Sequence, residues 1–214
     1  MREPLHVPTG APKAVLDGAL GLALAAGAPL RIEGPLQGAD LQVAQAAAQI
    51  AGVPEAARAL VEPGSHELTL PLPRAGLHLL ELPAPFAVAR ALWTLSWPLA
   101  LLGKPSELRL RGSNHDEGAP TFHDLRLCWA PLAAQFGLKL SLELTEAGFG
   151  EPGELVANLD PAPALLPLQA MHRGLLRQVS VIAAVAGGRN EAALEAAEEV
   201  VKAMRRRGLV AEAE

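Results

Sequence analysis

The sequence predicts an α+β protein built from two βαβαββ units, followed by a partial small α/β module. The chain contains short segments in which apolar and polar residues alternate, as in half-buried strands. Between them lie longer segments whose apolar residues recur at helical spacing. The order of these segments in residues 1–74 recurs in residues 75–160. Half of the 214 residues are apolar but only 3% are aromatic, so we expect an aliphatic core.

The first unit is expected to span residues 1–74. Gly27 is a typical residue to follow a helix, and residues 29–33, PLRIE, alternate as a strand does. Gly52 and Pro54 are typical of the end of a second helix. The predicted elements are an extended start at residues 6–8, helices at 12–27 and 39–51, and strands at 29–33 and 64–70.

The second unit is expected to span residues 75–160. Its Gly103-Lys104-Pro105 turn and the strand before Gly112 correspond to residues 27–29 and to the strand before Gly34, which indicates an internal duplication. Residues 84–102 are almost long enough to span a membrane, but Arg90 and Pro98 interrupt them, so we predict a buried helix and no membrane contact. The other predicted elements are a helix at 121–136 and strands at 77–82, 107–111, 138–144 and 154–159.

Residues 161–167, PAPALLP, are typical of a linker, and residues 168–214 form the partial insert-like module. We predict a strand at 175–186, a helix at 190–207 and a strand from 209 to 213. A module of this size is incomplete, so a homodimer or a second chain is expected to complete it. The single cysteine, Cys128, is predicted to be buried, and the absence of disulfides and of an N-terminal apolar run favours the cytoplasm.

A polar turn between the 107–111 strand and the 121–136 helix carries most of the ionisable groups. Imidazoles and carboxylates are suitable metal ligands and proton carriers, so the turn is a candidate metal or acid–base site. The alternative is a solvated turn whose acids favour the start of a helix. No metal is assigned, because no metal-motif spacing is present. The candidate cluster comprises Asn114, His115, Asp116, His123 and Asp124, with Glu117 beside it.

Other polar groups are weaker candidates. Ser65, His66 and Glu67 alternate along one strand, so a hydrolytic triad among them is geometrically poor. The candidate phosphate or RNA contacts are Arg111, Arg173 and Arg177, with ordinary exposed charges as the alternative. Residues 205–207, RRR, suit a helix C-terminus or an RNA contact. The net charge of −5 argues against a protein that coats nucleic acid by charge alone, but it leaves room for a local basic pocket.

Several short motifs resemble those of one known family in their order and spacing. They are Gly64-Ser65-His66-Glu67-Leu68, Gly112-Ser113-Asn114, Ala119-Pro120, Pro131-Leu132, Phe136-Gly137, Gly148-Phe149 and Arg173-Gly174. Over nearly the whole chain this pattern is similar to that of the RNA 3′-terminal phosphate cyclases. The resemblance implies repeated βαβαββ units with a small inserted α/β domain. It also implies ATP- and metal-dependent conversion of an RNA 3′-phosphate to a 2′,3′-cyclic phosphate, through a histidine near the C-terminus that becomes adenylated.

The chain departs from the family pattern at its phosphate-binding motifs. Where the family has Glu-Gly-Gly-Gly-Gln-Ile-Leu-Arg, residues 9–16 are TGAPKAVL, and where it has Gly-Thr-Ala-Gly-Ser, residues 82–86 are LPAPF. Two prolines in the second segment each remove a backbone N–H that could bind phosphate. The basic turn before the second helix is uncharged here, and no counterpart of the nucleophilic histidine is expected in this chain. We therefore expect a cyclase-like protein that is degenerate or incomplete, the alternative being a non-catalytic RNA-binding or protein-interaction scaffold.

Overall fold

A computed structural model describes residues 3–53, 55, 60, 62, 64–162, 164–168, 175–176, 178–188 and 190–213. The contacts between residues divide the chain into two compact units, Met1–Leu168 and Gln169–Glu214. Both units mix helices with β-sheet, which confirms the predicted α+β class. The predicted division between residues 74 and 75 stays a prediction, since both halves lie within the first compact unit.

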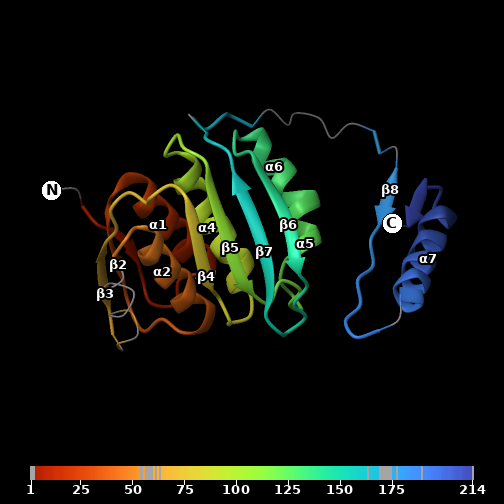
Figure 1. Ribbon diagram of the computed structural model, residues 1–214, viewed down its shortest axis with the longest axis horizontal. Helices are drawn as coiled ribbons and strands as arrows, with labels where there is room; N and C mark the ends of the chain where they lie inside the picture. The colour runs from red at the N-terminus through yellow and green to blue at the C-terminus, as the bar shows by residue number, and fades with distance from the viewer. Residues whose placement is uncertain are drawn as a thin grey trace. The chain divides into compact units, whose positions relative to one another are not determined.

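The first sheet has the strand order β1-β2-β3 (Figure 1). β2 runs parallel to β1 and antiparallel to β3, and Leu30 lies opposite both Leu5 and Leu68. Its strands and the two helices that follow β1 and β2 are β1 (Leu5–Val7), α1 (Lys13–Ala26), β2 (Pro29–Ile32), α2 (Gly38–Ile50) and β3 (His66–Thr69).

The second sheet has the order β4-β5-β7-β6, and over its first three strands it repeats the directions of the first sheet. β4 and β5 are parallel, while β7 is antiparallel to both β5 and β6. The strands and the long helix between the first two are β4 (Leu77–Glu81), α4 (Ala87–Ala100), β5 (Ser106–Gly112), β6 (Leu140–Glu146) and β7 (Gly153–Leu159).

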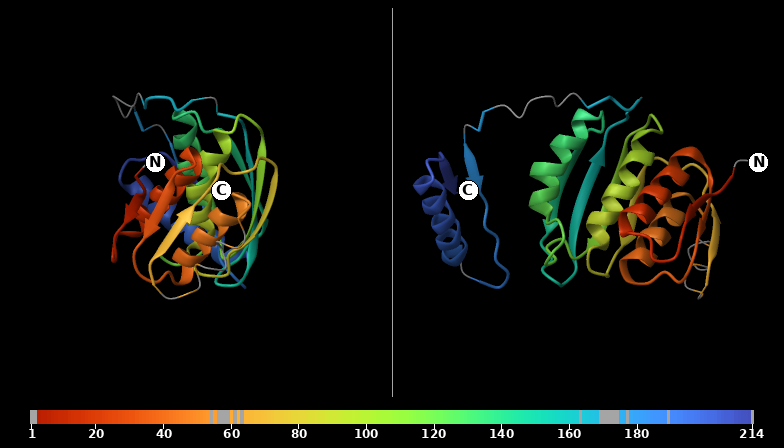
Figure 2. Two further views of the ribbon diagram at one scale, coloured as in Figure 1. Left: turned by 90° about the vertical axis from the view of Figure 1, so that its left-hand side faces the viewer. Right: turned by 180° about the vertical axis from the view of Figure 1, so that it is seen from behind.

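Helices α1, α2 and α4 pack against one another and join the two sheets in one aliphatic core. α1 also packs on β1 and β2, and α4 on β5 and β7, and the view from behind shows α1 beside α4 (Figure 2). At Gly21 the two helices approach closely, because a Cβ there would lie 3.2 Å from the carbonyl oxygen of Thr94. The predicted buried helix at 84–102 is therefore confirmed as α4, and no helix of the described residues is long and apolar enough to span a membrane.

The predicted helix at 121–136 is observed, but a π-helical turn interrupts it. It consists of α5 (Phe122–Asp124), the π-helical turn η1 (Leu125–Trp129) and α6 (Ala130–Gln135). Pro131 has no N–H for the carbonyl of Leu127, and the N–H of Ala130 instead donates to Leu125, five residues back. The prediction that Cys128 is buried is wrong, because Phe122, Leu125 and Ala133 are the buried residues of this helix and Cys128 is exposed.

The second compact unit contains β8 (Val179–Val181), α7 (Asn190–Arg206) and β9 (Ala211–Ala213). β8 and β9 form a parallel two-stranded sheet, with Ser180 opposite Glu212. The predicted strand at 175–186 is wrong in length, because a ladder extends only as far as its partner and β9 has three residues. The predicted helix at 190–207 is confirmed, with Arg205 and Arg206 in its last turn.

Candidate functional site

The polar turn after β5 is tied to the β6–β7 turn through Asn114. The Asn114 side chain donates to the carbonyl of Glu146 at 3.0 Å and accepts the N–H of Gly148 at 2.9 Å. The backbone N–H groups of Asn114 and His115 both donate to the carbonyl of Gly148, at 3.1 and 3.0 Å. Asn114 is 4% exposed. Its polar groups hold the fold together, so the predicted site residue Asn114 has a structural role here.

His115 lies in an aromatic group formed with Phe149 and His123. Its ring stacks on Phe149, with centroids 4.3 Å apart and an angle of 21° between the planes, and it meets His123 edge-on at 5.7 Å. Nδ1 of His115 is 2.7 Å from Oδ1 of Asn114, and Nε2 is buried with no hydrogen-bond partner among the described residues. Burial, and next the charge of His123, lower the pKa of His115, against a smaller opposing effect of Asp116 and Asp124.

The carboxylates of the polar turn bind backbone groups. Asp124 accepts the N–H of Thr121 at 2.9 Å, while the Thr121 hydroxyl accepts the N–H of Asp124, so the two form a capping box at α5. Asp116 accepts the N–H of Phe86 at 2.8 Å, at the start of α4. Within the described part of the chain, no group of three or more His, Cys, Asp or Glu residues could hold a metal ion.

A pocket of about 260 Å³ lies at the start of α4. Its lining includes one residue from each of two segments compared above with family motifs, Lys13 of residues 9–16 and Phe86 of residues 82–86, together with Ala119-Pro120. The rest of the lining is Gly118 and three residues of α4. The lining residues are Lys13, Phe86, Ala89, Arg90, Trp93, Gly118, Ala119 and Pro120. The pocket, rather than the polar turn, is therefore the place where these segments meet.

Phe86 and Lys13 shape one side of this pocket. Phe86, immediately before α4, has φ +67°, a left-handed conformation that is costly for a residue with a bulky side chain. The Nζ atom of Lys13 lies 5.7 Å from the centroid of the Phe86 ring, so the ammonium group has a cation–π contact.

Arg90, one of the lining residues, forms a buried ion-pair network at the pocket. Its guanidinium donates to both carboxylate oxygens of Asp17 on α1, at 2.9 and 2.7 Å, and to Asp40 in the first turn of α2, at 2.5 Å. Burial lowers the pKa of Arg90, but the hydrogen bonds to Asp17 and Asp40 outweigh burial and raise the pKa above its usual value. One arginine thus joins α1, α2 and α4 and has its charge fully compensated.

Sequence reasoning missed Asp17 and Asp40 as partners. The available signal was the single arginine inside the apolar residues 84–102, because a charge at a buried position requires a partner. Which carboxylates supply it depends on how the helices pack, and the sequence pattern does not contain that information.

The remaining predicted residues lie elsewhere. Arg111 is exposed on the outer face of β5, opposite Glu81 of β4 and Glu154 of β7, and is not part of the pocket lining. His66 is buried while Glu67 is exposed, as the alternation along that strand predicted. Arg205 donates to the carbonyl of Ala211. Arg173 and Arg177 lie outside the described residues.

Comparison with known proteins gives one consistent family. The family described as "RNA 3′-terminal phosphate cyclase" matches residues 18–206. The RNA 3′-terminal phosphate cyclase of Koribacter versatilis (strain Ellin345) is 30% identical over 184 residues, which are 80% of this chain and 51% of that protein. That of Ralstonia nicotianae is 30% identical over 179 residues, or 78% and 51% of the two chains.

A third relative, the cyclase of Pseudomonas aeruginosa (strain LESB58), is 34% identical over 127 residues, which are 57% of this chain and 37% of that protein. The chain therefore spans about half the length, or less, of these curated relatives. The match to the family over residues 18–206, together with the similarity to the Koribacter protein over most of the chain, shows that this chain belongs to the RNA 3′-terminal phosphate cyclase family.

Proposed function

We propose that this chain is a cyclase-like protein that does not, by itself, carry out the ATP-dependent cyclisation of RNA 3′-phosphates. The observation that carries the proposal is the hydrogen bond from the N–H of Phe86 to Asp116. The N-terminus of a helix is a natural anion site, and here the anion is a carboxylate of the chain itself. An incoming phosphate would have to displace Asp116 or bear repulsion from it.

The charges around the pocket argue in the same direction. Arg90 is paired with both Asp17 and Asp40, so the three side chains together carry a formal negative charge and do not attract a triphosphate. Pro83 and Pro85 provide no N–H groups in the turn before α4. ATP with its metal is the cofactor that family membership implies, and these residues do not fit a metal-bound triphosphate.

The pocket retains one feature that suits a single phosphate, the ammonium group of Lys13. A lysine beside an aromatic ring can form one charge-assisted contact with a terminal phosphate and a stacking surface for a base. We therefore propose that the chain binds an RNA 3′ end without reacting with it. Cys128 is the single cysteine and is an exposed residue, which favours a reducing compartment such as the cytoplasm.

The catalytic part of the proposal is tested with radiolabelled ATP. The purified chain is incubated with α-labelled ATP, Mg²⁺ or Mn²⁺ and a 3′-phosphorylated oligoribonucleotide, and the products are separated on denaturing gels. We expect neither a labelled protein band nor a cyclic phosphate, while the full-length Koribacter protein serves as a positive control for the assay. A labelled band from this chain would overturn the proposal.

The binding part is tested by fluorescence anisotropy with the same oligonucleotide carrying either a 3′-phosphate or a 3′-hydroxyl. One lysine–phosphate contact is expected to give about a three- to tenfold preference for the phosphate. Lys13→Ala should remove this preference, and the matched variant Lys104→Ala, at an exposed lysine outside the pocket, should retain it. Equal affinity for the two ends would contradict RNA 3′-end recognition.

A second candidate function, a protein-interaction scaffold, is favoured by the second compact unit. Among its described residues, one helix packs on a two-stranded sheet, and several large apolar side chains are exposed: Leu175, Leu176, Ile182, Val185, Leu194, Val200 and Val210. A second chain or a second copy that added a strand and a helix would cover them. Light scattering over a concentration series tests a second copy, and a monomer at every concentration would exclude it.

A further inference from the structure

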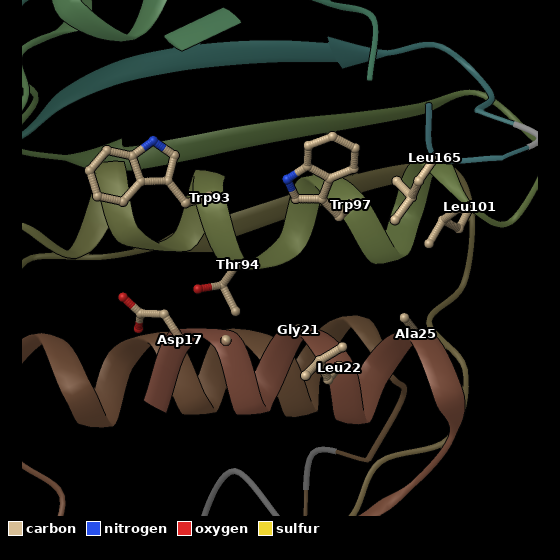
Figure 3. A pocket seen from close by; sticks show the side chains of 10 residues that line it. Asp17, Gly21, Leu22, Ala25, Trp93, Thr94, Trp97, Leu101 and Leu165 are labelled. Atoms are coloured by element: carbon tan, nitrogen blue, oxygen red, sulfur yellow. The ribbon is translucent and has the colours of Figure 1, made fainter. Parts of the chain in front are cut away.

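A groove of about 400 Å³ runs between α1 and α4, next to the site described above but with a different character (Figure 3). Its volume falls within the usual range for small-molecule sites, and its walls are mostly apolar. The lining residues are Asp17, Gly18, Gly21, Leu22, Ala25, Trp93, Thr94, Trp97, Leu101 and Leu165.

The two sides of the groove differ in shape. On α4, Trp93 and Trp97 project from successive turns, and Leu101 and Leu165 lie beyond Trp97 (Figure 3). On α1, Gly18 has no side chain, and a Cβ built there would meet no atom within 4 Å. The indoles of Trp93 and Trp97 lie on the side of α4 away from α1 in Figure 3, while Gly18 leaves the α1 wall of the groove without a side chain at that point, so the open space of the groove suits a flat ring.

Thr94 supplies one polar group inside this apolar space. It is 4% exposed, its hydroxyl has no hydrogen-bond partner among the described residues, and it points from α4 toward α1 (Figure 3). A buried hydroxyl without a partner costs about 1–3 kcal/mol. A ligand that carried a hydrogen-bond acceptor would recover this cost.

The charges select for a neutral ligand. The carboxylate of Asp17 lines one end of the groove, and the groove lining that the structure describes contains no lysine, arginine or histidine. The positive charge nearest to Asp17 is that of Arg90, which is already shared with Asp40. A phosphate or carboxylate would therefore lose its hydration and find no cation in return.

We propose that the groove between α1 and α4 is a binding site for a small, neutral, planar heteroaromatic molecule that accepts a hydrogen bond from Thr94. The ring lies against Trp93 and Trp97, over the surface left open by Gly18. The groove shares Trp93 with the pocket proposed to recognise an RNA 3′-phosphate, but it selects a different ligand, because it disfavours anions.

The test uses benzimidazole as the probe and the ¹⁵N-labelled chain, observed by ¹H–¹⁵N NMR. The chain has three tryptophans, and Trp129 lies outside the groove, so its indole signal is an internal reference. We expect the indole signals of Trp93 and Trp97 to shift with a Kd on the order of 1 mM, as for other ligands of this size, while Trp129 stays unchanged. Equal shifts of all three signals, or none, would overturn the proposal.

Three variants decide between a specific binding site and general apolar adsorption. Gly18→Leu fills the groove and should abolish the shifts, whereas Ala14→Leu, which places the same side chain on α1 outside the groove, should leave them unchanged.

Thr94→Val removes the hydroxyl at constant shape. The wild type should bind benzimidazole about five- to tenfold more tightly than indole, which lacks the acceptor nitrogen, and Thr94→Val should lose this difference. A preference that Thr94→Val retains would contradict the assigned role of the hydroxyl.

Discussion

At the scale of single residues, Arg90 joins three helices, whereas the sequence had drawn attention to the polar turn. It is 6% exposed and bonded to two carboxylates from two other helices. Replacing it by Met leaves Asp17 and Asp40 close together without a cation, and breaking a buried pair in this way typically costs about 3–5 kcal/mol. We expect Arg90→Met to lower the free energy of unfolding by this amount, measured by urea unfolding.

The matched control for this variant is Arg109→Met. Arg109 also forms an ion pair, at 2.6 Å from Glu107, but its side chain is 48% exposed. Exposed pairs contribute little, so the control should change the free energy of unfolding by less than about 1 kcal/mol. Arg90→Lys should fall between the two, because an ammonium cannot form the two-pronged contact with Asp17. Similar effects of the Arg90 and Arg109 variants would show that the network is not important for stability.

His115 gives a prediction about pH. Its folded-state pKa is lowered, mainly by burial, so near and below pH 6.5 the unfolded chain binds a proton more readily than the folded one. The contribution of His115 to stability is therefore present above its unfolded pKa and is lost as the pH falls. His115→Phe retains the stack on Phe149 and removes the titration, so its melting temperature should decrease less between pH 7.5 and pH 5.5 than that of the wild type.

The control for the pH effect is His78→Phe, on β4 and distant from Phe149. It shows what the loss of a histidine elsewhere in the chain does to the melting temperature. If the His115 variant and the wild type lose stability equally on acidification, another group is responsible for the acid sensitivity.

The polar turn shows why residue roles were harder to predict than residue positions. The sequence indicated correctly that Asp124 stands at the start of a helix, because capping is a local interaction. Asp116 binds the backbone of Phe86, 30 residues earlier, and His115 stacks on Phe149 beyond the next strand. These contacts depend on how β5, α4 and the β6–β7 turn come together, so a run of neighbouring ionisable residues in the sequence looked like one site.

At the scale of elements, the end of β5 lies directly against the turn before α4. This close contact explains why the Gly112-Ser113-Asn114 motif begins with a glycine. A Cβ on Gly112 would lie 2.1 Å from the carbonyl oxygen of Leu82 and 2.9 Å from Val88. The first contact is with backbone, so it can be relieved only by moving the turn. We expect Gly112→Ala to destabilise the chain by about 3 kcal/mol or more, measured by urea unfolding.

Gly18→Ala is the matched glycine substitution. Gly18 lies within α1, and an added Cβ meets no atom within 4 Å. Alanine is favoured over glycine in a helix by about 0.5–1 kcal/mol, so this variant should be more stable than the wild type. The two substitutions add the same methyl group with opposite expected signs. A mild effect of Gly112→Ala would mean that the turn before α4 can shift.

Helices and strands of the first compact unit were largely predictable, because each has a periodic apolar face. α1, α4 and β5 lie within a few residues of their predicted ranges. The π-helical turn before Pro131 was not predicted, since the pattern contains a proline but does not say whether a helix ends there or continues around it. The three-residue β8 was overestimated for a similar reason, because apolar residues indicate burial and not the length of the partner strand.

At the scale of the whole molecule, the two compact units differ in how much core they contain. The first has an extended aliphatic core shared by two sheets and three long helices. In the second, the buried apolar residues that the structure describes are Ala197, Val201 and Ala211, two of which have very small side chains. A unit with so little buried apolar surface is expected to be marginally stable.

Hydrogen–deuterium exchange of the full chain tests this difference. Amides of α4 should exchange only through global unfolding of the first unit, whereas amides of α7 should exchange at least 100-fold faster, through local opening of the second unit. If a second copy covers the exposed side chains of the second unit, the protection of α7 should rise with protein concentration while that of α4 stays constant. Equal protection of α4 and α7 at all concentrations would mean that the two units unfold together, and the small core of the second unit would then need stabilisation from within the same chain.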